Sequence, residues 1–289
     1  MEVSKMEKVM YKKTHTNAYM SKMSDVIEWF AGKGFNAHAS RYARYKNHID
    51  EFYRSKSILE MEANFKNLNL AFRECVEIVT VYSAFKDEQS VGFHDRLEQV
   101  ITGQDFFAPL SKNDSARDFL YELVVAADFN DLGYTIDFDQ KTDVVAKRNE
   151  DIIFIECKRI KSSKRLEENF NKAGKQLSEI VRGNYYGLIF IDIYNCISNK
   201  IRAYPYQNNI DMCVELNNAV KGFCDDDERI INNLLDKYID ATSGVCFTTN
   251  VCLWLENVTP QFFKKRYIQV HKNSSDVKMK KLDCLLSKQ

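Results

Sequence analysis

The sequence predicts an α/β fold in which helices flank a mixed β-sheet, preceded by an all-helical N-terminal region. Only three prolines and ten glycines interrupt 289 residues, which favours long helices over a sandwich of many short strands. Apolar residues recur at helical spacing before residue 104. From residue 113 the pattern becomes helix, three strands, helix, strand, helices and two strands, the order of a layered α/β domain. We therefore expect a helical domain at 1–110 and an α/β domain at 111–289.

The N-terminal helices follow from capping residues and apolar spacing. Ser24 and Asp25 can cap a helix that runs through Phe30. Four apolar residues share one face of the next helix: Tyr42, Tyr45, Ile49 and Phe52. Further helices are expected at 59–85 and 93–101, before a break at 107–110. The second helix also interleaves bases with tyrosines, as nucleic-acid binders do, although tyrosines at helical spacing more commonly form a core face.

The second half of the chain alternates helices with strands. An apolar helix at 119–132 ends at Gly133, and Ser115 with Asp118 forms a variant of the capping box. The following elements are strands at 134–138, 143–146 and 152–158, a helix at 166–181, and strands at 186–194, 244–255 and 266–271. The segment 205–240 carries 8 acids against 3 bases, which predicts a solvated helical excursion.

Two acidic residues are expected to face each other across the second hairpin. A turn between Asn149 and Glu150 pairs residues whose numbers sum to 299, so Asp143 lies opposite Glu156. Opposed residues share a face with Cβ atoms about 4.5–5.5 Å apart. Two carboxylates placed this way repel unless a cation lies between them. Oxygen ligands with an open position suit Mg²⁺ or Mn²⁺ better than zinc.

Two further charged residues are expected beside this pair. Strand alternation places Lys158 on the same face as Glu156, where an ammonium can orient a water or neutralise charge on a phosphate. The alternative without catalysis is an ordinary strand surface on which Lys158 only forms ion pairs with the acids. Glu122 stands alone among apolar residues of its helix, and a buried carboxylate is unfavourable unless it is paired or bound to metal. It either faces the same site or pairs with an arginine.

In this order the residues resemble the restriction-endonuclease-like PD-(D/E)xK nucleases, most closely their Mrr- and RecB-type branch. The resemblance rests on Glu122, Asp143, Glu156-Cys157-Lys158 and a following helix with Gln176, and it covers about residues 113 to 195. Thr142 stands where the family name has proline, a position at which proline is often absent. The resemblance implies a restriction-endonuclease-like core within the predicted mixed sheet.

The resemblance also implies a role for each residue. Asp143 and Glu156, with the backbone carbonyl of Cys157, would hold Mg²⁺, for which Mn²⁺ can substitute. Glu122 would support metal binding, and Lys158 would assist the attacking water. Gln176 would steady the site, unless it is only an amide on the helix surface.

The function implied is a Mg²⁺-dependent nuclease that hydrolyses phosphodiester bonds, most readily a DNA endonuclease. A role in restriction or anti-phage defence is an analogy at the level of the fold. The alternatives are an RNA-directed nuclease and a catalytically inactive nucleic-acid-binding or assembly protein on the same fold. Cleavage of both strands needs two sites, which favours a homodimer. The N-terminal helices are candidates for target recognition, dimerisation or contact with a regulatory partner.

The charge balance and the cysteines limit which partners and which cellular compartment the sequence is compatible with. The chain balances 41 Lys and Arg against 41 Asp and Glu, so a nucleic-acid footprint has to be a local patch. Four bases directly after the third strand are candidate phosphate contacts or a solvated loop: Arg159, Lys161, Lys164 and Arg165. A tail after Pro260 with 8 bases and 2 acids extends this footprint or is simply soluble. Scattered cysteines and the lack of a signal segment or membrane span favour a cytoplasmic protein without a membrane partner.

Overall fold

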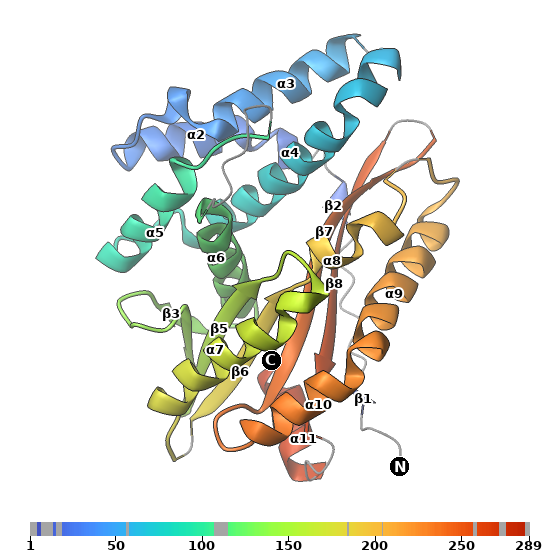
Figure 1. Ribbon diagram of the computed structural model, residues 1–289. Helices are drawn as coiled ribbons and strands as arrows, with labels where there is room; N and C mark the ends of the chain where they lie inside the picture. The colour runs from blue at the N-terminus through green and yellow to red at the C-terminus, as the bar shows by residue number, and fades with distance from the viewer. Residues whose placement is uncertain are drawn as a thin grey trace.

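The computed structural model describes residues 5–6, 14–15, 19–55, 58–106, 115–183, 185–203, 205–256, 259–271 and 276–286. A mixed β-sheet forms its centre, and helices cover both faces of the sheet (Figure 1). The predicted α/β class and the helical N-terminal region are therefore confirmed. The expected break at 107–110 lies outside the described residues. No described helix is both long enough and apolar enough to cross a membrane.

The sheet has eight strands in the order β1-β8-β7-β6-β5-β4-β3, and β2 also pairs with β8. The strands are β1 Lys5–Met6, β2 Thr14–His15, β3 Thr135–Asp137, β4 Val144–Arg148, β5 Asp151–Arg159, β6 Tyr186–Asp192, β7 Gly244–Trp254 and β8 Pro260–Gln269. β5, β6 and β7 run parallel to one another, whereas β3, β4 and β5 form an antiparallel meander. β1 and β2 belong to the N-terminal region, so that region is not helical throughout.

The N-terminal helices pack as a layer on one face of the sheet. They are α2 Met23–Gly32, the 3-10 turn η1 Ala37–Ala39, α3 Arg41–Ser55, α4 Ile58–Phe85 and α5 Val91–Ile101. Tyr42, Tyr45 and Ile49 of α3 are fully buried, so the interleaved tyrosines are a core face. One hydrophobic cluster extends from α2 through α6 (Ala116–Asp131) to the sheet, which means that the N-terminal helices and the sheet share a core.

The predicted capping box of α6 does not form. The Ser115 side chain makes no capping hydrogen bond, and only its backbone carbonyl accepts from the N–H of Asp118, 2.9 Å away. The end of the helix is as predicted, because Gly133 has a φ of 85°, a left-handed conformation that glycine adopts without strain.

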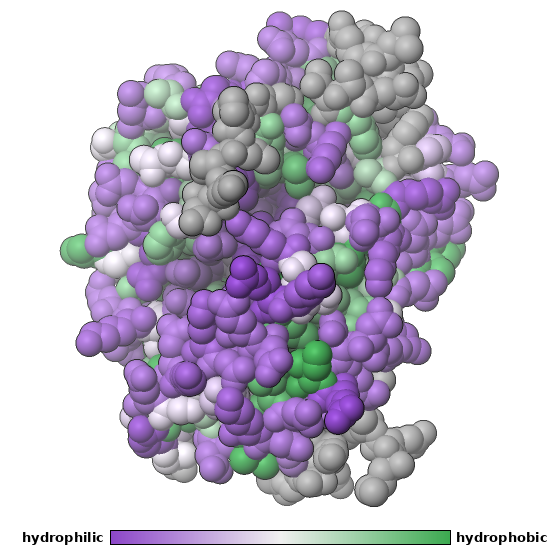
Figure 2. Space-filling view, viewed as in Figure 1, coloured by the Kyte–Doolittle hydropathy of each residue, from purple (hydrophilic) through white to green (hydrophobic). Residues whose placement is uncertain are grey.

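Helices on the other face complete the second core. They are η2 Ser163–Arg165, α7 Leu166–Ile180, α8 Tyr194–Ile197, η3 Ser198–Lys200, α9 Asn209–Asp226 and α10 Glu228–Lys237. α9 and α10 were expected as a solvated excursion, but Leu216, Phe223 and Leu235 are buried in this core. Their acids are exposed or partly exposed, and Figure 2 shows that the face of the molecule seen in that view is mostly hydrophilic. The charge count identified the solvated side of the helices and missed their apolar stripe.

The predicted basic tail is partly a buried strand. β8 begins at Pro260 rather than at 266, and it therefore includes Lys264, Lys265 and Arg266. Lys264 and Arg266 both pair with Asp128 of α6, and all three bases have little exposure. These bases cannot extend a nucleic-acid footprint. The last described helix, α11 Asp276–Leu285, follows β8.

Candidate active site

The β4–β5 hairpin has the predicted register. Val144 pairs with Ile155, and the pairing continues to Arg148 opposite Asp151, so every pair sums to 299. Asn149 makes the turn with a φ of 55°, which asparagine tolerates better than most residues. Asp143 immediately precedes β4, and its Oδ2 accepts a hydrogen bond of 2.8 Å from the N–H of Cys157. Asp143 is thereby anchored beside Glu156, as the register requires.

Lys158 links the two carboxylates. Its Nζ lies 3.2 Å from Oδ2 of Asp143 and 2.9 Å from Oε2 of Glu156. Glu156 is 1% exposed, whereas the side chains of Asp143 and Lys158 are 18% and 17% exposed. The opposite face of β5 belongs to Ile153, Ile155 and Cys157, which pack in the core shared with the N-terminal helices. The predicted strand alternation is therefore confirmed.

Glu122 joins this group from α6 and also pairs with an arginine. Its Oε2 lies 3.5 Å from Nε of Arg96, a residue of α5, and its side chain is 14% exposed. Burial raises the pKa of Glu122 to about 8, with Asp143 adding to the rise and with Arg96 and Lys158 opposing it. The two alternatives for Glu122 are thus both present, since it has an arginine partner and lies within the field of Asp143.

The electrostatics of the group are those of a crowded set of acids. Burial, reinforced by Asp143 and opposed by Lys158, raises the pKa of Glu156 to about 7. Burial works to lower the pKa of Lys158, but Asp143 and Glu156 outweigh it, so the pKa of the lysine is raised. The raised pKa values of Glu156 and Glu122 mean that joint ionisation of the acids is unfavourable, and a cation beside them would favour their ionised forms, as Lys158 already does in part.

The donor chemistry of the group fits Mg²⁺ or Mn²⁺, which prefer carboxylate oxygens. Asp143 and Glu156 would be the two ligands, and Glu122 is a third carboxyl group nearby. Within the part of the chain that the structure describes, no three acidic, histidine or cysteine side chains are already arranged around a common metal position. Lys158 neutralises the pair instead. A divalent cation held by both carboxylates has to displace at least one of the two contacts of that ammonium.

Gln176 lies outside the group. Its side chain is exposed on α7, and no hydrogen bond links it to the acids among the described residues. Phe170, Ala173 and Leu177 form the buried face of α7 and set its rotation about its axis. The structure therefore gives Gln176 no contact through which it could steady the site, and a helix-surface amide describes it.

The four bases predicted to contact phosphate fall into two classes. Nε of Arg159 lies 3.1 Å from Oδ2 of Asp192, and this arginine is only 15% exposed, so it is part of a buried ion-pair network. Lys161, Lys164 and Arg165 lie in the segment that follows β5, and their side chains reach solvent. The accessible positive charge of the four thus lies on these three residues, next to the strand that carries Lys158, and Arg165 also pairs with the exposed Glu168.

Asp192 and Arg96 are two charged residues that the sequence did not single out. Asp192 ends β6, is 2% exposed and accepts from Nη2 of Arg73 at 2.9 Å and from the N–H of Tyr194 at 2.9 Å. An acid at the end of an otherwise apolar strand was the available signal. Arg96 lies on an amphipathic helix with other charges around it and had no distinguishing signal.

Comparison with known proteins gives no relative. No family model, no curated protein and no solved structure matches the chain. Function therefore has to be inferred from the residues and their geometry.

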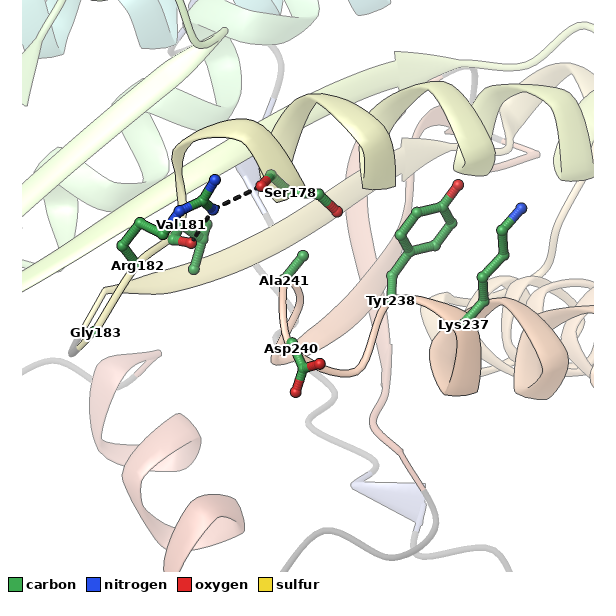
Figure 3. A pocket seen from close by; sticks show the side chains of 8 residues that line it. All are labelled: Ser178, Val181, Arg182, Gly183, Lys237, Tyr238, Asp240 and Ala241. Carbon is green, nitrogen blue, oxygen red and sulfur yellow. Dashed lines mark hydrogen bonds between the residues drawn. The ribbon is translucent and has the colours of Figure 1, made fainter.

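A groove elsewhere on the surface does not contain the acids. It has a volume of about 450 Å³ and is lined by Ser178, Val181, Arg182, Gly183, Lys237, Tyr238, Asp240 and Ala241. These residues precede β6 and β7, so the groove lies at the amino ends of the parallel strands, whereas Lys158 is near the carboxyl end of β5. Arg182 folds back onto the carbonyl of Ser178 (Figure 3) and is therefore not directed into the groove as a ligand contact.

Proposed function

We propose that this protein is a Mg²⁺-dependent nuclease of the PD-(D/E)xK type, with Mn²⁺ able to substitute, and that its substrate is DNA. One observation carries the proposal: Asp143 and Glu156 lie beside each other with the Lys158 ammonium within 3.2 Å of both carboxylates. The order of elements supports it. α6, the antiparallel β3, β4 and β5, then α7 and the parallel β6 follow the sequence expected of a restriction-endonuclease-like core.

Each residue has a distinct role in the proposed reaction. Asp143 and Glu156 would hold the metal, together with the backbone carbonyl of Cys157, and Glu122 would support metal binding from α6. When bound, Mg²⁺ supplies the positive charge that activates water and stabilises the phosphate in its transition state. Because the pKa of Lys158 is raised, this lysine stays protonated at neutral pH. It would therefore orient the attacking water and neutralise the phosphate rather than remove a proton.

The exposed bases support a nucleic acid as the substrate. Lys161, Lys164 and Arg165 follow β5 directly and can contact a phosphate backbone that enters the acidic site. Arg159 is held by Asp192, so we assign it to the support of the site instead. Cleavage of both strands of a duplex would need two copies of the chain, and light scattering with and without DNA measures this directly.

The test is cleavage of plasmid DNA, linear DNA and RNA by the purified full chain with Mg²⁺, Mn²⁺ or EDTA. Lys158→Ala should lower the rate of metal-dependent DNA cleavage by about 100-fold or more. Lys147→Ala is the matched control, because Lys147 lies near the turn of the same hairpin and pairs with Asp137 at 2.7 Å.

Four results would contradict the proposal. Cleavage in EDTA, or an active Lys158→Ala variant, would remove the mechanism. Faster cleavage of RNA than of DNA would assign the other substrate. A mobility shift without cleavage, across both metals and all substrates, would identify an inactive nucleic-acid-binding protein.

A further inference from the structure

Arg96 connects the N-terminal helices to the acidic site. This residue of α5 is 15% exposed, and its Nη1 donates to the carbonyl of Phe138 at 2.7 Å and to that of Gly92 at 3.0 Å. Its Nη2 donates to the carbonyl of Thr142 at 3.4 Å. Its Nε lies 3.5 Å from Oε2 of Glu122. One guanidinium therefore contacts α6 and the segment between β3 and β4.

The contacts of Arg96 bracket the segment that ends in Asp143. Phe138 begins this segment and Thr142 directly precedes Asp143, so their carbonyls mark its two ends. A planar guanidinium can donate to several acceptors at fixed angles, whereas a lysine ammonium is a single point of charge. Arg96 thus fixes the distance between two elements that each provide an acidic residue. These are the β3–β4 segment, which ends in Asp143, and α6, which contains Glu122.

The α5 helix is itself seated firmly on this segment. The N–H of Gly92 donates to Oδ1 of Asp139 at 3.0 Å. A Cβ at Gly92 would lie 2.1 Å from the carbonyl oxygen of Phe138, so only glycine allows the helix to approach this closely. The Phe138 ring also contacts the rings of Phe85 and Phe93, with both centroid distances 5.1 Å. The position of Arg96 is therefore set by several independent contacts.

We propose that Arg96 is a positioning residue that aligns Asp143 with Glu122 and thereby makes divalent-metal binding depend on the placement of α5. This proposal rests on the nuclease function proposed above, because it takes a divalent metal as the ligand of the acids. It assigns a task to the N-terminal helical layer: a side chain of α5 supports the metal affinity of a site formed by later elements.

The sign of the effect separates positioning from simple charge. Arg96 is a cation close to Glu122, so its removal makes the site more negative and, by charge alone, tightens metal binding. Removal of a residue that holds ligands in place weakens metal binding, typically by about 10- to 100-fold. The two roles predict changes in opposite directions.

The experiment measures Mn²⁺ affinity by calorimetry on the full chain, together with the Mg²⁺ concentration that gives half-maximal cleavage. Arg96→Gln should weaken Mn²⁺ binding by about tenfold or more and raise the Mg²⁺ requirement by a similar factor. Affinity for DNA in EDTA should not change, because the Arg96 guanidinium is engaged by backbone carbonyls and Glu122 rather than offered to a phosphate. Arg96→Lys should recover only part of the metal affinity.

Arg148→Gln is the matched control. Arg148 also spans two backbone carbonyls, those of Leu132 and Cys284, each at 3.0 Å. It lies at the turn of the β4–β5 hairpin, the opposite end of β4 from Asp143. The control should therefore leave Mn²⁺ affinity unchanged.

Equal or tighter Mn²⁺ binding by folded Arg96→Gln overturns the proposal. If Arg96→Gln does not fold but Arg96→Lys does, the test is made on Arg96→Lys. The proposal is then overturned if Arg96→Lys binds Mn²⁺ as tightly as the wild type or more tightly.

The wild-type protein separates failure of this proposal from failure of the proposed function. A wild-type chain that binds no Mn²⁺ overturns both. A wild-type chain that binds Mn²⁺ and cleaves DNA, with unchanged affinity in Arg96→Gln, overturns the positioning role alone.

Discussion

Replacing Glu156 with glutamine removes a carboxylate that the fold buries beside Asp143. Glu156 has a pKa of about 7 in the folded chain, compared with a usual value of 4.5. The folded state therefore disfavours its ionisation. The associated stability is fully present below about pH 4.5 and is lost as the pH rises toward 7, because the unfolded chain releases this proton first.

The size of the effect follows from the difference between the two pKa values. Each tenfold change in proton affinity corresponds to about 1.4 kcal/mol, so the rise from 4.5 to about 7 corresponds to about 3 kcal/mol of lost stability above neutral pH. Most of this loss, about 2 to 3 kcal/mol, falls between about pH 5 and pH 8. Glutamine cannot ionise, so Glu156→Gln should not show this pH-dependent loss of stability.

The measurement is urea unfolding in EDTA at several pH values, followed by the fluorescence of Trp29 and Trp254. The free energy of unfolding of Glu156→Gln minus that of the wild type should rise by about 2 to 3 kcal/mol from about pH 5 to pH 8. Titrating groups remote from the site contribute to both proteins and cancel in this difference, whereas Asp143 and Lys158 interact with Glu156 and contribute to it. Glu167→Gln, at an exposed position of α7, is the control and should follow the wild type.

A difference that stays constant with pH would refute the reasoning. It would mean that Glu156 ionises as readily in the folded chain as in the unfolded chain. The carboxylates would then be farther apart or better hydrated than the structure has them, and a cation site between them would lose its electrostatic basis.

Three further predictions test other parts of the structure. Mg²⁺ at about pH 8 should raise the thermal midpoint of the wild type and raise that of Asp143→Asn much less, since a ligand of the folded state alone stabilises it; equal shifts would place the metal elsewhere. Gly92→Ala should lose about 1–3 kcal/mol in urea unfolding because its Cβ meets the carbonyl of Phe138. The control is Gly222→Ala, which has open space at its Cβ and should gain about 0.5–1 kcal/mol of stability. If Gly92→Ala is as stable as the wild type, the close docking of α5 is contradicted. Asp192→Asn should lose about 3–5 kcal/mol because Arg159 loses its buried counter-charge and Arg73 keeps only Glu77. The exposed Asp226→Asn should change little, and equal stabilities of the two variants by urea unfolding would argue against the network.

The elements with strong local signals could be predicted from the sequence. The apolar spacing of α3, the glycine that ends α6 and the β-branched segments of β5 and β6 each depend on residues within a few positions. The start of β8 could not be predicted, because Lys264, which precedes the predicted strand, becomes compatible with a buried strand only when Asp128 lies against it. Polarity indicated a tail, and a distant partner overrode it.

The same distinction applies to the predicted acidic excursion. Segment 205–240 has both a charged side and an apolar stripe, and its charge count describes only the first. Leu216 and Phe223 are buried because the sheet offers a hydrophobic surface for them. Which side of an amphipathic helix matters for the fold depends on what lies beside it.

The sequence by itself determined the central three residues of the candidate site. A two-residue turn and the two-residue repeat of a strand are local properties, and together they place Asp143 opposite Glu156 and Lys158 beside them. Only the tertiary structure decided the rest: the pairing of Glu122 with Arg96, the burial of Arg159 against Asp192 and the exposure of Gln176. These depend on how each helix is rotated and seated against the sheet, which is set by packing between residues far apart in the chain.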